Sequence, residues 1–215
     1  RKNCLIIDEV HEWNLNIETL VAYVKYIRDN HINDDLKVIL MSATIDTTSL
    51  EEYFNAKTLE IPGTCYDVEL EKIVPAYKYD TIERKVNDGK NILVFEAGKS
   101  EINETINYLN TTYCFNLRND VEIIPLHGEL SFEDQMKIWD DSNNKKKVIV
   151  TTNIAQTSIT VPYVDVVIDM GTAKIVEVDE NGIESLKIVD ISQADIMQRK
   201  GRAGRTKDGE YYLCS

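Results

Sequence analysis

The segment from Gln198 to Arg205 reads Q-R-K-G-R-A-G-R and holds three arginines and a lysine, in a chain whose formal net charge is -13. Guanidinium groups are planar, permanently charged and able to hold a phosphate through two hydrogen bonds. If a helix starts here, Arg202 and Arg205 share one face of it, where they could stabilise charge on a transferring phosphoryl group. A solvated basic turn is the alternative that these residue types leave open.

A second group of residues that could take part in a reaction is the pair Asp8-Glu9. The pair directly follows the short apolar run C-L-I-I. Such a run is typical of a strand buried on both faces, and ligands bind at the carboxyl ends of strands in open α/β sheets. Asp8 could hold Mg²⁺, directly or through water, and Glu9 could orient a water for attack. The alternative is the polar first turn of a helix, where acidic side chains are favoured.

The elements around these residues alternate between strand and helix, which predicts an α/β fold with parallel sheets. We place a domain boundary after residue 70, because Pro62-Gly63 and a mixed tyrosine-rich stretch interrupt the pattern there. Asn181-Gly182 predicts the turn of a β-hairpin near 174–189, and Ser192 could cap the helix that leads into 198–205. Expected strands cover 4–7, 37–41, 92–95, 121–125, 148–150, 164–170 and 211–214.

Composition limits the classes of protein that fit. No apolar run approaches the ~20 residues of a membrane-spanning helix, so no membrane contact is expected. The four cysteines form no CxxC pair, which favours a reducing cytoplasm over a disulfide framework or metal centre. The acidic balance argues against binding nucleic acid through an overall positive field, so any such contact must be local.

In chain order, the loops after the expected strands contain D-E-V-H, S-A-T, I-L-V-F-x-x-G, T-N-I-A-Q-T-S-I-T and Q-R-x-G-R-A-G-R. This series resembles the DEAH-box helicases of superfamily 2, and most of all their bacterial RNA-helicase members. The resemblance extends over essentially all 215 residues. It implies two RecA-like parallel-sheet domains, residues 1–70 and 71–215, with the first truncated at its N-terminus. These would clamp ATP between them and grip single-stranded or partly duplex RNA.

The resemblance also implies roles by position. Asp8 would serve Mg²⁺, and Glu9 would orient or activate the attacking water. Arg202 and Arg205 would act as arginine fingers on the γ-phosphate of ATP, with Gln198 in the same pocket. These five residues would form the hydrolytic centre.

A further set would couple that centre to RNA. His11 would bridge toward Gln198, and Ser42 and Thr44 would link the nucleotide to strand movement. The 174–189 hairpin corresponds to the element that helps to separate strands. Contacts to the RNA backbone would come from Gly98, Lys99 and Thr152.

The chain departs from the family pattern at several positions. Val10 replaces the usual Ala, which should matter little. Gln156 stands where Glu is usual, and Pro162 where an acidic residue often contacts nucleotide, so those nucleotide contacts are in question. Ala97 replaces a common hydroxyl residue, so one RNA contact is in question.

The chain also contains no GxxxxGK[ST] phosphate loop, and the domain expected after the second RecA-like domain is missing. We therefore expect a fragment that hydrolyses little or no ATP by itself, from a parent ATP-dependent RNA helicase. The other readings are a RecA-like binding or scaffold module without turnover, and a translocase on DNA. An upstream phosphate loop would favour the helicase, and stimulation by RNA rather than DNA would exclude the DNA translocase.

Overall fold

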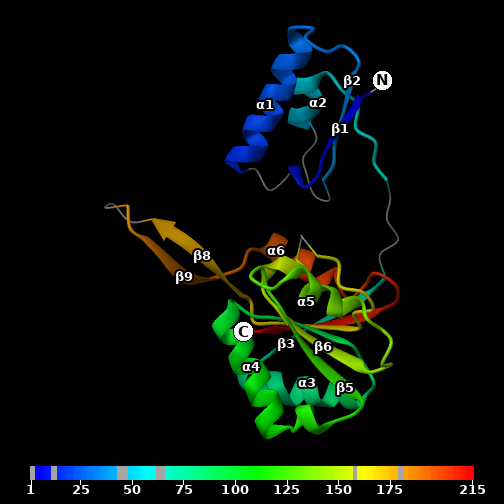
Figure 1. The fold of residues 1–215 in the computed structure, drawn as a ribbon, viewed down its shortest axis with the longest axis vertical. Helices are drawn as coiled ribbons and strands as arrows, with labels where there is room; N and C mark the ends of the chain where they lie inside the picture. The colour runs from blue at the N-terminus through cyan, green and yellow to red at the C-terminus, as the bar shows by residue number, and fades with distance from the viewer. Residues whose placement is uncertain (1–2, 11–13, 43–47, 62–65, 157–158, 179–181) are drawn as a thin grey trace. The chain divides into compact units, whose positions relative to one another are not determined.

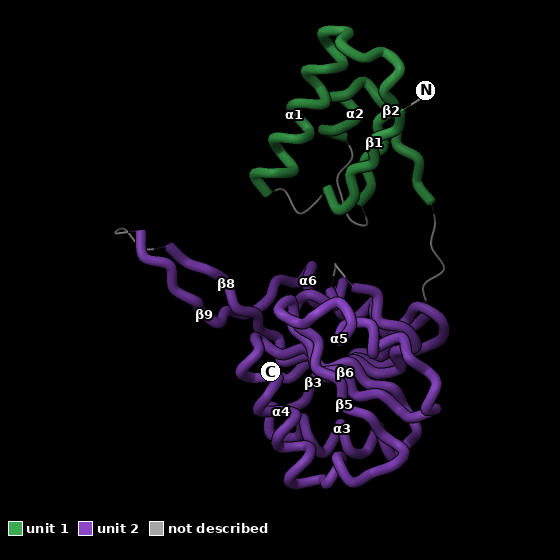
Figure 2. Tube along the Cα trace, in the orientation of Figure 1, with its two compact units in different colours: residues 1–62 green, residues 63–215 purple. Residues whose placement is uncertain are grey.

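The computed structural model describes residues 3–10, 14–42, 48–61, 66–156, 159–178 and 182–215. Two compact units make up the chain, residues 1–62 and residues 63–215 (Figure 2). The boundary predicted after residue 70 falls inside a strand of the second unit, β3 (Val68–Ile73). Because β3 pairs with a strand at the far end of the chain, its first residues belong to unit 2.

Unit 1 contains two parallel strands, β1 (Asn3–Ile7) and β2 (Leu36–Leu40), and two helices, α1 (Leu15–Asp29) and α2 (Thr48–Phe54). The Asn14 side chain caps α1 by accepting the backbone N–H groups of Asn16 and Ile17. Apolar side chains on one face of the strands pack with the helices: the buried cluster is Ile7, Val10, Val21, Val24 and Phe54.

The expectation that 4–7 is buried on both faces is wrong for the strands of unit 1. Ile6 and its pairing partner Ile39 are 55% and 46% exposed. Successive side chains of a strand point to opposite faces, and the core cluster of unit 1 lies on the other face. The two strands of this unit are therefore half-buried.

Unit 2 is built on a six-stranded sheet whose paired strands are all parallel, in the order β3-β10-β7-β4-β6-β5. Besides β3, its strands are β4 (Ile92–Phe95), β5 (Val121–Leu126), β6 (Lys146–Thr151), β7 (Val166–Asp169) and β10 (Gly209–Cys214). Every residue of β4 and β7 is buried, as expected for central strands covered on both faces. The predicted parallel α/β architecture is confirmed here.

Helices cover both faces of this sheet (Figure 1). On one face, α3 (Lys78–Asn87) and α4 (Lys99–Thr112) bury Ile82, Val86, Ile102 and Leu109 against alternate strand residues. On the other, α5 (Phe132–Met136) leads into a 3₁₀ turn, Lys137–Trp139, that buries Ile138. On that same face, α6 (Gln193–Lys200) buries Ile196. Short 3₁₀ turns also cover Pro75–Tyr77, Phe115–Leu117 and Asn153–Ala155.

A hairpin projects from this sheet, formed by β8 (Thr172–Val178) and β9 (Glu184–Asp190) (Figure 1). Of the two residues that predict the turn, Asn181 and Gly182, only Gly182 lies among the described residues. Gly171 joins β7 to β8 with φ +68°, a conformation that glycine adopts without the steric cost of a Cβ atom. The hairpin is thus nearly continuous with a central strand of the sheet.

Candidate active site

The acidic pair of unit 1 follows β1 directly, as predicted. Asp8 is exposed and Glu9 is half-buried, and the Glu9 backbone N–H donates to Asp8 Oδ1 at 2.8 Å. Glu9 has φ 54°, a left-handed conformation uncommon for residues other than glycine. Strained backbone of this kind concentrates at functional positions. Ser42 follows β2, the strand that pairs with β1, whereas His11 and Thr44 lie outside the described residues.

The three predicted RNA contacts lie at the carboxyl ends of two adjacent strands of unit 2. Gly98 and Lys99 begin α4 just after β4, and Thr152 follows β6. The Glu96 backbone N–H donates to the Thr151 carbonyl at 2.8 Å, which joins the two loops at their bases. The structure therefore brings these three residues to one edge of the sheet.

The absence of a side chain at Gly98 leaves room for the end of the Lys174 side chain, whereas the φ of −167° at Gly98 suits any residue. A Cβ there would lie 2.7 Å from Lys174 Cδ and 2.8 Å from Lys174 Nζ. Lys174, at the base of the hairpin, binds the Glu101 carboxylate at 2.7 Å and Ser100 Oγ at 3.0 Å. Burial by itself would raise the pKa of Glu101, but hydrogen bonds from Lys174, its own backbone and Ser100 hold it below its usual value.

Lys99 forms an exposed ion pair with Glu129 at 2.5 Å. Hydrogen bonding to Lys99, together with its charge, lowers the pKa of Glu129. Beneath this loop, Glu96 accepts hydrogen bonds from Lys78 at 2.8 Å and from Thr105 at 2.6 Å, and all three side chains are buried. This buried cluster fixes the end of β4 to α3 and α4.

The basic segment does not form a helix start. Ser192 caps α6 in a capping box with Asp195, and the helix ends at Lys200, with Gly201 as its C-cap. Arg202 and Arg205 therefore follow the helix and do not share a helical face. Arg202 is 8% exposed, whereas Arg205 is exposed and donates to Thr160 Oγ1 at 3.3 Å. The turn is tight because a Cβ on Gly204 would lie 2.8 Å from the Tyr66 carbonyl oxygen.

The remaining arginine of this segment, Arg199, was not singled out from the sequence. It is 1% exposed and pairs with Asp169 at 2.7 Å, above the ring of Phe95. Asp169 also accepts a hydrogen bond from the Tyr211 hydroxyl at 2.7 Å. Burial, with the charge of Asp169, raises the pKa of Tyr211 well above its ordinary value. The sequence signal for Asp169 as the partner of Arg199 is that it is an acidic residue at the end of the apolar run V-V-I-D.

Gln156 connects this buried pair to Gln198. Its amide accepts from Arg199 Nε at 3.0 Å and donates to Gln198 Oε1 at 2.9 Å. Gln156 comes from the loop after β6, close in sequence to Thr152. The structure thus links the loop predicted to contact RNA with the helix that carries Gln198.

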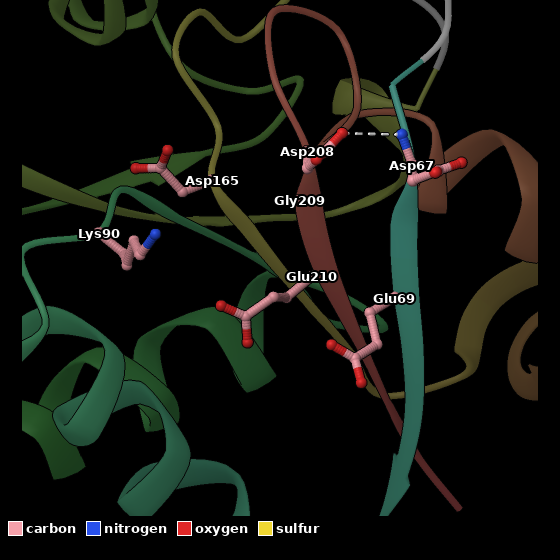
Figure 3. A pocket seen from close by; sticks show the side chains of 7 residues that line it. All are labelled: Asp67, Glu69, Lys90, Asp165, Asp208, Gly209 and Glu210. Carbon is pink, nitrogen blue, oxygen red and sulfur yellow. Dashed lines mark hydrogen bonds between the residues drawn. The ribbon is translucent and has the colours of Figure 1, made fainter.

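A separate hollow of about 370 Å³ lies at the opposite edge of the sheet, where strands begin (Figure 3). The Asp67 backbone N–H donates there to Asp208 at 3.2 Å, and Asp165 pairs with Lys207 at 2.5 Å. Its lining residues are Asp67, Glu69, Lys90, Asp165, Asp208, Gly209 and Glu210. Five carboxylates in this lining repel phosphates, so the hollow does not suit a nucleotide or RNA.

Among the described residues, no cluster of three or more His, Cys, Asp or Glu side chains could hold a metal ion. Magnesium bound with nucleotide needs fewer protein ligands, because phosphates and water complete its shell. Asp8, exposed at the end of β1, offers the hard oxygen ligand that such an ion prefers. The Asp8 carboxylate is therefore suited to be one ligand of such an ion.

A six-stranded parallel sheet covered by helices on both faces is the architecture of a RecA-like domain. Residues 72–207 match the family model described as the helicase conserved C-terminal domain. The chain belongs to the DEAH-box helicases of superfamily 2.

Individual relatives extend the similarity across both units. The chain is 37% identical to the ATP-dependent RNA helicase HrpA of Escherichia coli K12 over 220 residues, covering 95% of this chain and 16% of that protein. It is 37% identical to HrpA of Borreliella burgdorferi, covering 97% of this chain and 26% of that protein. The crystal structure of the E. coli DEAH/RHA helicase HrpB is similar over 99% of this chain and 28% of the HrpB chain, with a TM-score of 0.85 and 29% sequence identity. The chain therefore spans between 16% and 28% of the length of these relatives.

No helix among the described residues is both long enough and apolar enough to cross a membrane.

Proposed function

We propose that the protein carrying this chain is an ATP-dependent RNA helicase, which couples ATP hydrolysis to movement along RNA and to its unwinding. The observation that carries this proposal is the 37% identity to E. coli HrpA over 95% of the chain. The chain carries both the acidic pair after β1 and the arginine segment that begins in α6. A scaffold without turnover is not favoured, because both sets of charged residues are present.

In this proposal, unit 1 supplies Asp8 and Glu9 to the hydrolytic reaction. Asp8 holds Mg²⁺, which when bound neutralises charge on the phosphates of ATP. The Glu9 carboxylate orients the attacking water and accepts its proton. Ser42, Thr44 and His11 couple this reaction to the rest of the protein.

Unit 2 supplies the positively charged side chains of the proposed hydrolytic centre. Arg205 is exposed and can donate to a phosphate through two N–H groups, which stabilises charge in the transition state. Two further residues of unit 2 belong to this centre: Arg202, which is mostly buried, and Gln198. The acidic and the basic groups of the proposed reaction therefore come from different units of the chain.

RNA binding falls to the loop edge of unit 2, through Gly98, Lys99 and Thr152. Backbone contacts of this kind carry little sequence preference. They also allow an acidic chain to bind RNA, because the favourable charge is local. We further propose a cytoplasmic location, in keeping with Cys4, Cys114 and Cys214, which are free thiols.

The test is ATP turnover by the full-length protein with single-stranded RNA, with DNA of the same sequence, and without nucleic acid. We expect strong stimulation by RNA. Glu9→Gln should lower kcat by on the order of a hundredfold, because the water loses its base. Arg205→Ala should lower kcat by on the order of a thousandfold and leave RNA affinity nearly unchanged.

Glu18→Gln is the matched control for the loss of charge in unit 1, because Glu18 lies exposed in the first turn of α1. Its turnover should equal that of the unmodified protein. Absence of ATP turnover would refute the helicase assignment. Equal stimulation by DNA and RNA would refute the choice of RNA, and equal losses of kcat and RNA affinity in Arg205→Ala would refute the finger role.

A further inference from the structure

Gln156 occupies a buried position where a neutral amide meets groups of both charge types. Its side chain is 7% exposed. The amide nitrogen Nε2 lies 2.5 Å from Asp195 Oδ1 and 2.9 Å from Gln198 Oε1. The amide oxygen Oε1 lies 3.0 Å from Arg199 Nε. Each of the two N–H groups therefore has an acceptor, and the oxygen has a donor.

The orientation of this amide follows from its neighbours. Arg199 can only donate hydrogen bonds, so it must face the oxygen of Gln156. Asp195 is ionised and can only accept, so it must face the nitrogen. Arg199 is held in turn by Asp169, at 2.7 Å from its Nη1 atom. Both ends of the Gln156 amide are thus specified by charged groups that are themselves fixed.

This arrangement also orients Gln198. The second N–H of Gln156 requires an acceptor, so the Gln198 amide turns its oxygen toward Gln156. The nitrogen end of Gln198 is then the end directed elsewhere. A glutamine oriented in this way presents N–H donors, which suit a phosphate oxygen or a water.

Asp195 makes the position selective for an amide. A glutamate side chain at this position, which the family pattern would place there, could still accept from Arg199. Its second oxygen, however, would face the Asp195 carboxylate at the present 2.5 Å, where two negative charges repel strongly. Asp195 cannot turn away at no cost, because its Oδ2 atom accepts from Ser192 N at 3.0 Å and caps α6.

We propose that Gln156 is a positioning residue that orients Gln198 for ATP hydrolysis, and that Asp195 makes position 156 specific for an amide. This inference rests on the proposed function for its catalytic consequence. Its structural content, the coupling of Gln156 to Asp195, does not depend on that function.

The first test measures kcat for RNA-stimulated ATP hydrolysis by the full-length protein carrying Gln156→Leu, alone and combined with Gln198→Ala. Leucine removes the hydrogen bonds and keeps similar bulk. Gln156→Leu alone should lower kcat about tenfold, with little change in the KM for ATP. In the Gln198→Ala background it should cause no further loss. A loss of the same size in both backgrounds would show that Gln156 does not act through Gln198, and would overturn the proposal.

The second test introduces a negative charge at position 156. Gln156→Glu should lower kcat by about tenfold or more, and adding Asp195→Asn should recover thermal stability and not kcat, because an Asn amide can donate to the introduced carboxylate whereas that carboxylate cannot donate to Gln198. Gln193→Glu adds the same charge on the exposed side of α6 and should have no effect. Failure of Asp195→Asn to raise the Tm of Gln156→Glu would overturn the specificity claim, and full recovery of kcat would overturn the orienting role of the Gln156 N–H group.

Thermal unfolding of the 215-residue chain carrying Gln156→Glu, Asp195→Asn or both changes separates this proposal from the proposed function. If the unmodified full-length protein hydrolyses no ATP, the proposed function fails. Gln156→Glu should still lower the Tm, and Asp195→Asn should still restore part of it. Additive shifts in Tm would overturn the coupling itself, whatever the activity.

Discussion

Arg199 and Asp169 form a fully buried ion pair, 2.7 Å apart, in which the side chains are 1% and 0% exposed. Each partner has further contacts: Arg199 lies 4.7 Å above the Phe95 ring centroid, and Asp169 accepts from Tyr211. Desolvating two charges is costly, and the satisfied hydrogen bonds offset that cost. The pair joins α6 to the end of β7, so one arginine of the basic segment anchors that segment to the sheet.

Breaking this pair should be strongly destabilising. Arg199→Met leaves the Asp169 carboxylate buried without its cation, so we expect a loss of about 3–5 kcal/mol in the free energy of unfolding. Urea unfolding followed by circular dichroism measures this loss. The control is Lys187→Met, which breaks an exposed pair with Glu177 and should cost no more than about 1 kcal/mol. Equal losses in the two variants would contradict the anchoring role of Arg199.

The two glycines of the basic segment should respond differently to alanine. A Cβ at Gly204 would lie 2.7 Å from Val68 Cγ2 and 2.8 Å from the Tyr66 carbonyl oxygen. Gly204→Ala should therefore cost about 1–3 kcal/mol. Gly201 has φ −62°, and its nearest neighbour would lie at 3.4 Å, so Gly201→Ala should change stability by less than about 1 kcal/mol. A thermal unfolding series that reverses this order would refute the packing argument.

The contact between Glu101 and Lys174 should give a pH-dependent contribution to stability. The pKa of Glu101 is lowered in the folded chain, so the contribution is present above the unfolded pKa of about 4.3. It disappears as the pH falls through the folded pKa. Glu101→Gln should thus be less stable at pH 7 by no more than about 1 kcal/mol, and the difference should vanish near pH 3.

Urea unfolding at several pH values tests this dependence. Glu104→Gln, on an exposed position of the same helix, is the control for removal of a charge from α4. A difference between Glu101→Gln and the unmodified chain that persists unchanged at pH 3 would show that the contact with Lys174 is not its source.

Cys214 should resist alkylation. It is 4% exposed at the end of β10, and burial raises the pKa of its thiol to about 12. The thiolate is the reactive form, so iodoacetamide at pH 8 should modify the exposed Cys4 and Cys114 and spare Cys214. Peptide mass mapping before and after denaturation reads this directly. Modification of Cys214 in the folded chain at a rate similar to Cys114 would contradict its burial.

Much of the sheet of unit 2 follows from local pattern. The runs I-L-V-F and V-V-I-D are short, apolar and bounded by polar residues, and they form the central strands β4 and β7. The acidic pair, the Gly98 loop and Thr152 were predicted at strand ends for the same reason, and the structure places them there.

The distribution of roles among the arginines could not be predicted in this way. Arg199, Arg202 and Arg205 have the same chemistry within seven residues. Arg199 is buried because Asp169, thirty positions earlier, and Phe95 receive it. The helix that carries it ends at Lys200, before the two predicted fingers, because the chain turns there to bring Gly204 against β3. Contacts between distant segments decided both outcomes.

The corner at Gly171 has a mechanical consequence for the hairpin. β8 is seven residues long and starts directly after this glycine, so its far end lies about 20 Å from the corner. A rotation of roughly 10° about the corner would displace the far end of β8 by about 3–4 Å at that length. Near the corner, Arg199 holds the Thr172 carbonyl and Lys174 holds Glu101. Because displacement grows with distance from the corner, sub-ångström shifts at the end of β7 would become several-fold larger at the far end of β8.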